Sequence, residues 1–199
     1  MPKNDTTTAI QRKNRQRLLD AATIVFTRDG YDKASIRSVA KQAAMTPGLV
    51  YYYFKTKDEL LIAVQEHIQE RYHELHTSSP QPESVEQQLD AIRSRVIDTP
   101  DWYRWRYELY ALGLKRDDLR HEVAKVLDNG RQSVVKRLYP DVIADHQNAA
   151  ALAAILIACF DGLALQKLTD EKFDINATYD TLLEVLENYM KAQSQEQKI

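Results

Sequence analysis

The segment 35–61 constrains the fold of this chain most, because it holds two short helix-forming stretches separated only by a tight turn. Ser35 is suited to cap the first helix, whose apolar face recurs at helical spacing as Ile36, Val39, Ala40 and Ala43. Residues 44–45 occupy the turn. Thr46 then caps a second helix that begins at Pro47, where the missing N–H costs nothing. These signals predict a helix–turn–helix.

The second predicted helix presents aromatic rings to solvent. Val50 and Phe54 lie four residues apart on its inner side, and this leaves Leu49 facing outward. Consecutive helical residues point about 100° apart, so the run Tyr51-Tyr52-Tyr53 cannot be buried as a whole. A phenol offers an apolar face to thymine methyl groups or sugars and a hydroxyl to phosphate oxygens. The pattern favours a DNA-facing helix, and an ordinary helical hairpin with an adhesive surface is the alternative.

The loop after this helix is basic and leads into a third, longer helix. Thr56 is suited to cap that helix, and acidic residues follow in its first turn. Lys57 and the free N–H groups there suit a phosphate.

Charge is also divided along the chain. Residues 1–57 hold 11 Lys/Arg and 4 Asp/Glu, a net charge of +7, whereas residues 58–199 hold 16 and 25, a net charge of −9. This division indicates a basic DNA-facing head on an acidic body.

Residues 11–61 resemble the DNA-binding domain of the TetR family of bacterial transcriptional repressors. The matching signature comprises Ala22 and Phe26, then Gly30-Tyr31, the run 35–40 and the run 48–61. The resemblance covers about 50 of the 199 residues and is specific in order and spacing. It implies an all-α fold, with an N-terminal three-helix DNA-binding domain and a C-terminal helical domain for ligand binding and dimerisation. The expected boundaries are a flexible N-terminal arm at 1–10, the DNA-binding domain at 11–57, and the effector-binding and dimerisation domain at 58–199.

The resemblance also implies the DNA contacts. Backbone phosphates or base edges would meet the start of the first helix of the motif, the second helix would lie deepest in the groove, and the flanks would hold phosphates. The expected DNA-binding residues are Ser35, Ile36, Arg37, Thr46, Pro47, Gly48, Leu49, Tyr51, Tyr52, Tyr53 and Lys57. Ala44 stands where the family usually has Gly, and a left-handed turn there would cost roughly 1–2 kcal/mol. Few polar side chains face the bases, so specificity leans on methyl contacts, arginine and DNA shape.

Helical periodicity continues through the rest of the chain, in stretches at about 58–77, 83–98, 101–115, 117–138, 146–169 and 175–192. The stretch 101–115 is unusually aromatic, and its apolar arc is wider than a surface helix requires. One interpretation is the wall of a ligand cavity; core packing is the equally favoured alternative. The candidate ligand-binding residues are Trp102, Trp105, Tyr107, Leu109 and Tyr110.

The stretch 146–169 is apolar almost all round, so it must be buried on two sides. One side can face the core of this chain, and a second copy in a twofold four-helix contact would cover the other. Burial within a single subunit is the alternative. The candidate dimer-interface residues are Leu152, Ile155, Leu156, Cys159, Phe160, Leu163, Leu182, Leu186 and Tyr189. Cys159, the only cysteine, is interpreted as a small packing residue rather than a thiol sensor.

Catalytic signals are weak. The chain lacks a nucleophile–base arrangement, a phosphate-binding loop and a metal-binding cluster, so we expect neither an enzyme nor a cofactor. His67, Glu70 and His73 recur every three residues, a spacing that drifts around a helix, and they are interpreted as partly exposed rather than metal-binding. A signal-peptide core and a long uncharged apolar run are both absent from the sequence, which favours the cytoplasm and no membrane partner.

These observations predict a homodimeric, sequence-specific transcriptional regulator. As a repressor, it would leave a palindromic operator when a small apolar or amphipathic ligand binds the body. Its direction of regulation follows from the family resemblance alone. The alternative is a constitutive dimeric DNA-binding protein without a small-molecule effector, whose core would be filled where a cavity is expected.

Overall fold

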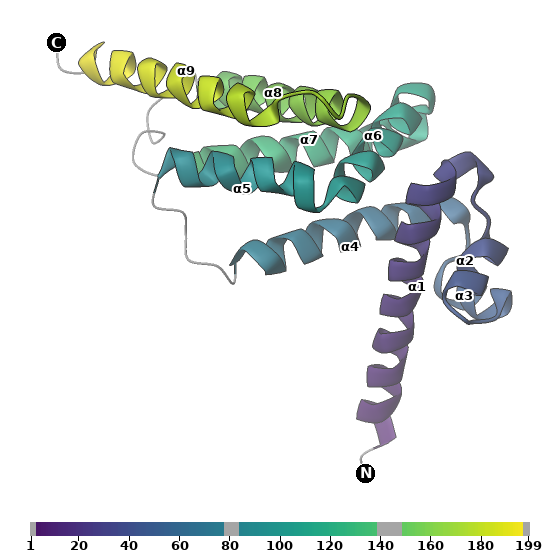
Figure 1. Cartoon of the computed structure of the whole chain (residues 1–199). Coiled ribbons are helices and arrows are strands. Elements are labelled where there is room, and N and C mark those ends of the chain that lie inside the picture. Colours follow the sequence, from purple (N-terminus) through teal and green to yellow (C-terminus); the bar gives the residue numbers. More distant parts are fainter. Residues whose placement is uncertain (1–2, 78–83, 139–148, 197–199) are drawn as a thin grey trace. The chain divides into compact units, whose positions relative to one another are not determined.

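The computed structural model describes residues 3–77, 84–138 and 149–196, and these residues form helices without any strand (Figure 1). This confirms the all-α fold class. In chain order the helices are α1 (Lys3–Lys33), α2 (Ile36–Gln42), α3 (Pro47–Tyr53), α4 (Lys57–Thr77), α5 (Val85–Asp98), α6 (Pro100–Lys115), α7 (Asp117–Leu138), α8 (Ala149–Thr169) and α9 (Ile175–Glu196). The expected breaks at 78–82 and 139–141 lie outside the described residues.

The chain divides into two compact units. The head unit consists of Met1–Pro80 with Arg104–Ala111, and the body unit consists of Gln81–Tyr103 with Leu112–Ile199. This division differs from the expected boundary at residue 57, because α4 buries Leu60, Leu61 and Val64 in the head and the middle of α6 joins them. Apolar packing, rather than the end of the DNA-binding motif, therefore sets the limit of the head unit.

Helices α2 and α3 form the helix–turn–helix of the head unit. Ser35 Oγ accepts the N–H of Ser38 at 3.1 Å, and Ser38 Oγ accepts the N–H of Ser35 at 2.9 Å, which closes a capping box. Thr46 Oγ1 accepts the N–H of Leu49 at 3.3 Å, and Pro47 occupies the first turn of α3. Ala44 lies in the turn with a φ of 51°, so this position does adopt the left-handed conformation expected to favour glycine.

Helix α1 differs from the expectation at its N-terminal end. It begins at Lys3, so residues 3–10 are helical where a flexible arm is expected. The sequence has neither Gly nor Pro between residues 3 and 29, and Asp5 in the first turn favours a helix start. At its other end Gly30 departs from helical geometry, with φ 73° and ψ 160°, and this kinks the chain before Tyr31.

Helices α5, α7, α8 and α9 make up most of the body unit, where α7 packs on α8 and α5 packs on α9 and α8. In its core, Phe160 of α8 stacks on Tyr179 of α9, with ring centroids 6.3 Å apart. Helix α8 is long and apolar enough to cross a membrane by length and composition alone, a test that core helices of soluble proteins also pass.

Gly113 of α6 lies close to Val123 of α7. A Cβ at this position would lie 2.4 Å from Val123 Cγ2, which is far inside van der Waals contact. We expect Gly113→Ala to lower the free energy of unfolding by about 1–3 kcal/mol through overpacking. Val123→Ala in the same chain should recover much of that loss by removing the clashing methyl groups. Urea unfolding of the two single variants and the double variant measures this; an additive double variant would contradict the steric explanation.

Candidate DNA-binding surface and α8–α9 groove

The exposed face of α3 carries the aromatic residues of the helix–turn–helix. The side chains of Tyr51 and Tyr52 are 51% and 60% exposed, whereas Val50 on the opposite side is fully buried. Leu49 and Tyr53 are half-buried, and the rings of Tyr52 and Tyr53 meet edge to face at 5.1 Å. The exposed face of α3 is therefore largely apolar and carries the phenol hydroxyls of its tyrosines.

Most of the other predicted contact residues are exposed on the same motif, namely Ser35, Arg37, Thr46, Pro47 and Gly48. Ile36 is the exception. Its side chain is only 8% exposed and belongs to the buried face of α2, so its burial does not favour the predicted DNA contact. The same periodicity that predicted an apolar face for α2 places Ile36 in that face.

Lys57 is directed toward the protein rather than toward solvent. Its Nζ donates to the carbonyl oxygen of Ala34 at 2.9 Å and lies 4.0 Å from the ring centre of Tyr31. The side chain is half-buried, and this differs from the expected phosphate clamp. The cap of α4 does follow the expectation, because Thr56 Oγ1 accepts the N–H of Glu59 at 3.0 Å.

Polar side chains of α1 brace the helix–turn–helix in a way that the sequence analysis did not anticipate. Arg17 Nη2 donates to the carbonyl oxygen of Ala43 at 2.8 Å, at the C-terminal end of α2. Gln11 Nε2 donates to the hydroxyl of Tyr52 at 3.4 Å, which ties α1 to α3. Both residues belong to the polar run 11–17, which was the only hint of this role in the sequence.

The outer surface of the head unit is basic. Among the described residues, its exposed cations include Arg12, Lys13, Arg15, Arg37, Lys41 and Lys55. Arg28 instead bonds its neighbour Asp29 at 2.7 and 2.8 Å; this hydrogen bonding lowers the pKa of Asp29 and raises the pKa of Arg28. Because Arg28 is exposed and Asp29 is only half-buried, their pairing adds little to stability. The remaining basic side chains suit a polyanionic partner.

The aromatic stripe of α6 does not form one wall. Trp105 and Leu109 are each 1% exposed in the core of the head unit, which favours core packing over the predicted ligand contact. Trp105 stacks on Phe26 at 5.6 Å and donates its indole N–H to Gln65 Oε1 at 2.9 Å. Periodicity could not separate a cavity wall from a core, and Gln65 supplies the buried polar partner that an indole requires in a core.

The other three candidates are half-buried and lie in different units. Trp102 belongs to the body unit, where the guanidinium of Arg95 lies 4.9 Å from its ring centre. Tyr107 and Tyr110 belong to the head unit, and Arg106 lies 5.0 Å from the ring centre of Tyr110. These three residues remain candidates for ligand contact.

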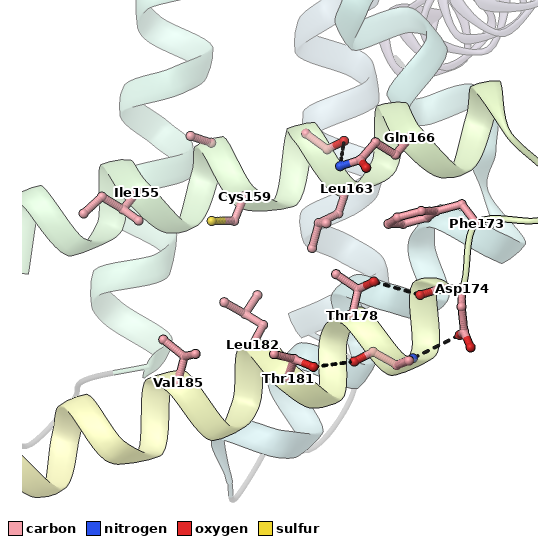
Figure 2. A pocket seen from close by; sticks show the side chains of 13 residues that line it. Ile155, Cys159, Leu163, Gln166, Phe173, Asp174, Thr178, Thr181, Leu182 and Val185 are labelled. Carbon is pink, nitrogen blue, oxygen red and sulfur yellow. Dashed lines mark hydrogen bonds between the residues drawn. The ribbon is translucent and has the colours of Figure 1, made fainter.

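An apolar groove of about 900 Å³ runs between α8 and α9 in the body unit (Figure 2). Figure 2 shows Cys159 and Leu163 of α8 facing Leu182 of α9 across it. Thr178 and Thr181 also line the groove, but their hydroxyls donate to backbone carbonyls one turn earlier, at 2.8 and 2.9 Å. The groove surface is therefore more apolar than its residue types indicate.

This groove separates the predicted interface residues into two groups. Ile155, Cys159, Leu163 and Leu182 line it, and Leu152 and Tyr189 are half-buried nearby in the chain. Leu156, Phe160 and Leu186 are at most 4% exposed in the subunit core, which favours packing within the subunit over the predicted interface role. Helix α8 is apolar on every side, and its sequence could not tell the inner side from the outer one.

His67 also differs from its expected exposed position. It is 4% exposed between α4 and α1, with Nε2 3.0 Å from Asp20 Oδ1 and 3.1 Å from Gln16 Nε2. The side chain of His73 lies outside the described set. Among the described residues, three or more His, Cys, Asp or Glu side chains do not come together as a metal site.

A helix–turn–helix with an exposed recognition helix, on a basic head joined to a helical body, defines a DNA-binding transcriptional regulator. The family model described as bacterial regulatory proteins, tetR family, matches residues 18–64. A second model, described as tetracyclin repressor-like, C-terminal domain, matches residues 80–188. The chain belongs to the TetR family of bacterial transcriptional regulators.

Individual relatives agree with this family. The nicotine-responsive transcriptional repressor HdnoR of Paenarthrobacter nicotinovorans is 30% identical over 166 residues, covering 78% of this chain and 84% of that protein. Two solved structures resemble most of the fold. A TetR-family member from Streptomyces coelicolor A3 has a TM-score of 0.69 at 25% identity, covering 86% of this chain and 96% of that one. The multidrug binding protein EbrR complexed with proflavin has a TM-score of 0.61 at 26% identity, covering 86% and 98%.

Proposed function

We propose that this regulator is a homodimeric repressor, and that a small apolar or amphipathic ligand bound to the body releases it from a palindromic operator. The observation that carries the proposal is the exposed aromatic face of α3, set among the exposed cations of the head unit. We further propose a cytoplasmic protein that acts by binding rather than by catalysis. Two heads on one twofold axis would read half-sites about 34 Å apart or at a related spacing.

The groove between α8 and α9 supports a second copy as the dimer partner. Ile155 and Val185 are both 59% exposed at its rim, an unusual amount of exposed apolar surface for two neighbouring helices. Two such faces would pack around a twofold axis as a four-helix contact. Gly162 adds to the argument, since a Cβ there would meet nothing within 4 Å in the subunit. A glycine within a helix costs about 1 kcal/mol relative to alanine, and close approach of a partner helix would explain it.

Two relatives support the proposal of a small apolar or amphipathic effector. HdnoR is named as nicotine-responsive, and EbrR was solved with proflavin. Both compounds are small, aromatic and amphipathic, and the half-buried rings of Trp102, Tyr107 and Tyr110 suit such ligands. A ligand would favour release only through its higher affinity for the released state. A constitutive DNA-binding dimer is the second candidate, favoured by the full burial of Trp105 and Leu109.

Selection of preferred duplexes from random DNA by the purified protein tests the proposal. Enrichment of a palindrome at moderate salt is the expected result, and recovery of unrelated duplexes would contradict sequence-specific binding. The selected duplex then serves as the probe for an effector screen. Small aromatic amphipaths should raise the melting temperature and release the duplex; a panel without either effect would favour the constitutive dimer.

Arg37 and Leu49 should carry part of the sequence preference. We expect Arg37→Ala and Leu49→Ala each to weaken the preferred duplex by about 1–3 kcal/mol and to relax the preference at particular base pairs. Lys41→Ala removes an exposed cation of α2 and is the matched control. It should weaken every duplex alike if it only contacts phosphate. Repeating the selection with each variant measures the sequence preference. If the selected DNA sequences do not change, Arg37 and Leu49 position the protein on DNA without reading its sequence.

A further inference from the structure

Glu108 of α6 meets the end of α1 at its kink. Glu108 Oε1 accepts the backbone N–H of Tyr31 at 2.5 Å, directly after Gly30 with its φ of 73°. A Cβ on Gly30 would lie 3.4 Å from the same carboxylate oxygen. The kink thus turns a backbone donor toward a half-buried carboxylate that belongs to a helix 77 residues further along the chain.

Tyr31 also contacts the first residues of α4 through its side chain. Its side chain is 7% exposed, and its hydroxyl donates to the carboxylate of Asp58. The ammonium of Lys57 lies 4.0 Å from the ring centre and donates to Ala34 O at 2.9 Å. We call the set Tyr31, Lys57, Asp58 and Glu108 the Tyr31 brace.

The brace ends at the turn that begins the DNA-binding motif. Ala34, whose carbonyl oxygen Lys57 holds, directly precedes Ser35, the N-cap of α2. The exposed Arg37 lies in the first turn of α2. A shift at Ala34 would therefore move the start of α2 and the guanidinium that it presents.

We propose that Glu108 is a positioning residue for DNA binding, which acts through the Tyr31 brace to hold the α1–α2 turn in its DNA-competent place. Lys57 acts in the same way, by bonding the turn rather than neutralising a phosphate. The inference rests on the proposed DNA-binding function and assigns a part in it to α6. The residues of α6 on either side of Arg104–Ala111 belong to the body unit.

Three replacements of Glu108 separate its acceptor oxygen from its charge. Glu108→Gln keeps an oxygen at the same place, Glu108→Asp keeps the charge but withdraws the oxygen by one methylene, and Glu108→Ala removes both. Losing a charge-assisted hydrogen bond should lower affinity for the selected duplex about tenfold or more in the Ala and Asp variants. The Gln variant should stay within about threefold of the parent, since a neutral acceptor replaces the charged one. Glu70→Ala, at an exposed position on α4, is the control and should change nothing.

Amide hydrogen exchange tests the contact without DNA. The Tyr31 amide should be protected in the parent and in Glu108→Gln, and should exchange faster in the other two variants. Slow exchange in all four proteins would overturn the contact itself. Fast exchange with undiminished affinity would overturn the positioning role. If random duplexes yield no preferred sequence, the proposed function fails while the exchange result still decides whether the brace exists.

The salt dependence of binding tests the role of Lys57. Lys57→Ala should lower affinity while leaving the slope of log K against log salt unchanged, because a positioning residue releases no counterion. Loss of a phosphate contact would instead reduce the slope by about 0.9. The double variant Lys57→Ala/Glu108→Ala should lose less affinity than the two single losses combined, since both act on one turn. A reduced slope together with additive losses would overturn the shared role.

Discussion

Replacing Ile155 with Asp is expected to convert the protein to monomers and to weaken binding to the palindromic duplex by orders of magnitude. The side chain is 59% exposed in the subunit, so the fold itself does not depend on it. In the proposed dimer, the new carboxylate would be buried against the apolar partner face without a counterion, which costs several kcal/mol. A monomer holds only one half-site, and loss of the second head should weaken binding about 10²–10⁴-fold.

Sedimentation and duplex binding measure this prediction together. Val185→Asp, at the opposite rim of the groove, should behave in the same way. Leu114→Asp is the matched control, because Leu114 is 82% exposed and does not line the groove. A dimeric Ile155→Asp variant would place the interface elsewhere. Phe160→Asp would be a poor test, because Phe160 is 4% exposed and its loss would damage the subunit core.

Trp105→Ala is expected to destabilise the head unit more than any other single truncation of the α6 stripe. The indole is 1% exposed, and removing a buried Trp typically costs about 3–5 kcal/mol. Gln65 is 7% exposed and would lose the donor at 2.9 Å, which leaves a buried amide oxygen without that partner. A side chain that lines a ligand cavity would be less costly to remove, because an open cavity already leaves one face of the ring without packing.

Urea unfolding measures the effect, with two variants for comparison. Trp105→Phe keeps the contact with Phe26 but loses the indole N–H, and it should fall between the parent and Trp105→Ala. Tyr110→Ala removes a half-buried ring from the same helix and should cost less. If Trp105→Ala were no less stable than Tyr110→Ala, the interpretation of Trp105 as core would be wrong.

Local signals in the sequence were sufficient for the helices of the head. Ser35 and Thr46 cap the predicted helices, and Ala44 adopts the left-handed turn that its position demands. Caps and turns depend on neighbours along the chain, so they can be read from the chain. Residues 3–10 are helical rather than a flexible arm because this polar segment contains no helix-breaking residue.

The assignments that the structure does not favour concern which partner covers an apolar face. Phe160 and Ile155 are both apolar residues of α8, yet Phe160 stacks on Tyr179 and Ile155 borders the groove. Trp105 and Trp102 lie three residues apart on one stripe, yet they belong to different units. Periodicity identifies an apolar side chain but not its tertiary neighbour, which comes from elements distant in sequence. For the same reason, the sequence could not indicate that Lys57 donates to the carbonyl oxygen of Ala34.

The middle of α6 belongs to the head unit and its two ends belong to the body unit, and this division matters for building chimeric regulators. Residues Arg104–Ala111 pack with the head unit although the chain on either side of them belongs to the body unit. A fusion that joins the first 80 residues to another regulator's sensor would leave Phe26 without Trp105, and Tyr31 without the acceptor Glu108. Exchange of sensing modules should therefore graft the eight-residue insert Arg104–Ala111 along with the DNA-binding portion. A single splice point cannot divide this protein into two interchangeable parts.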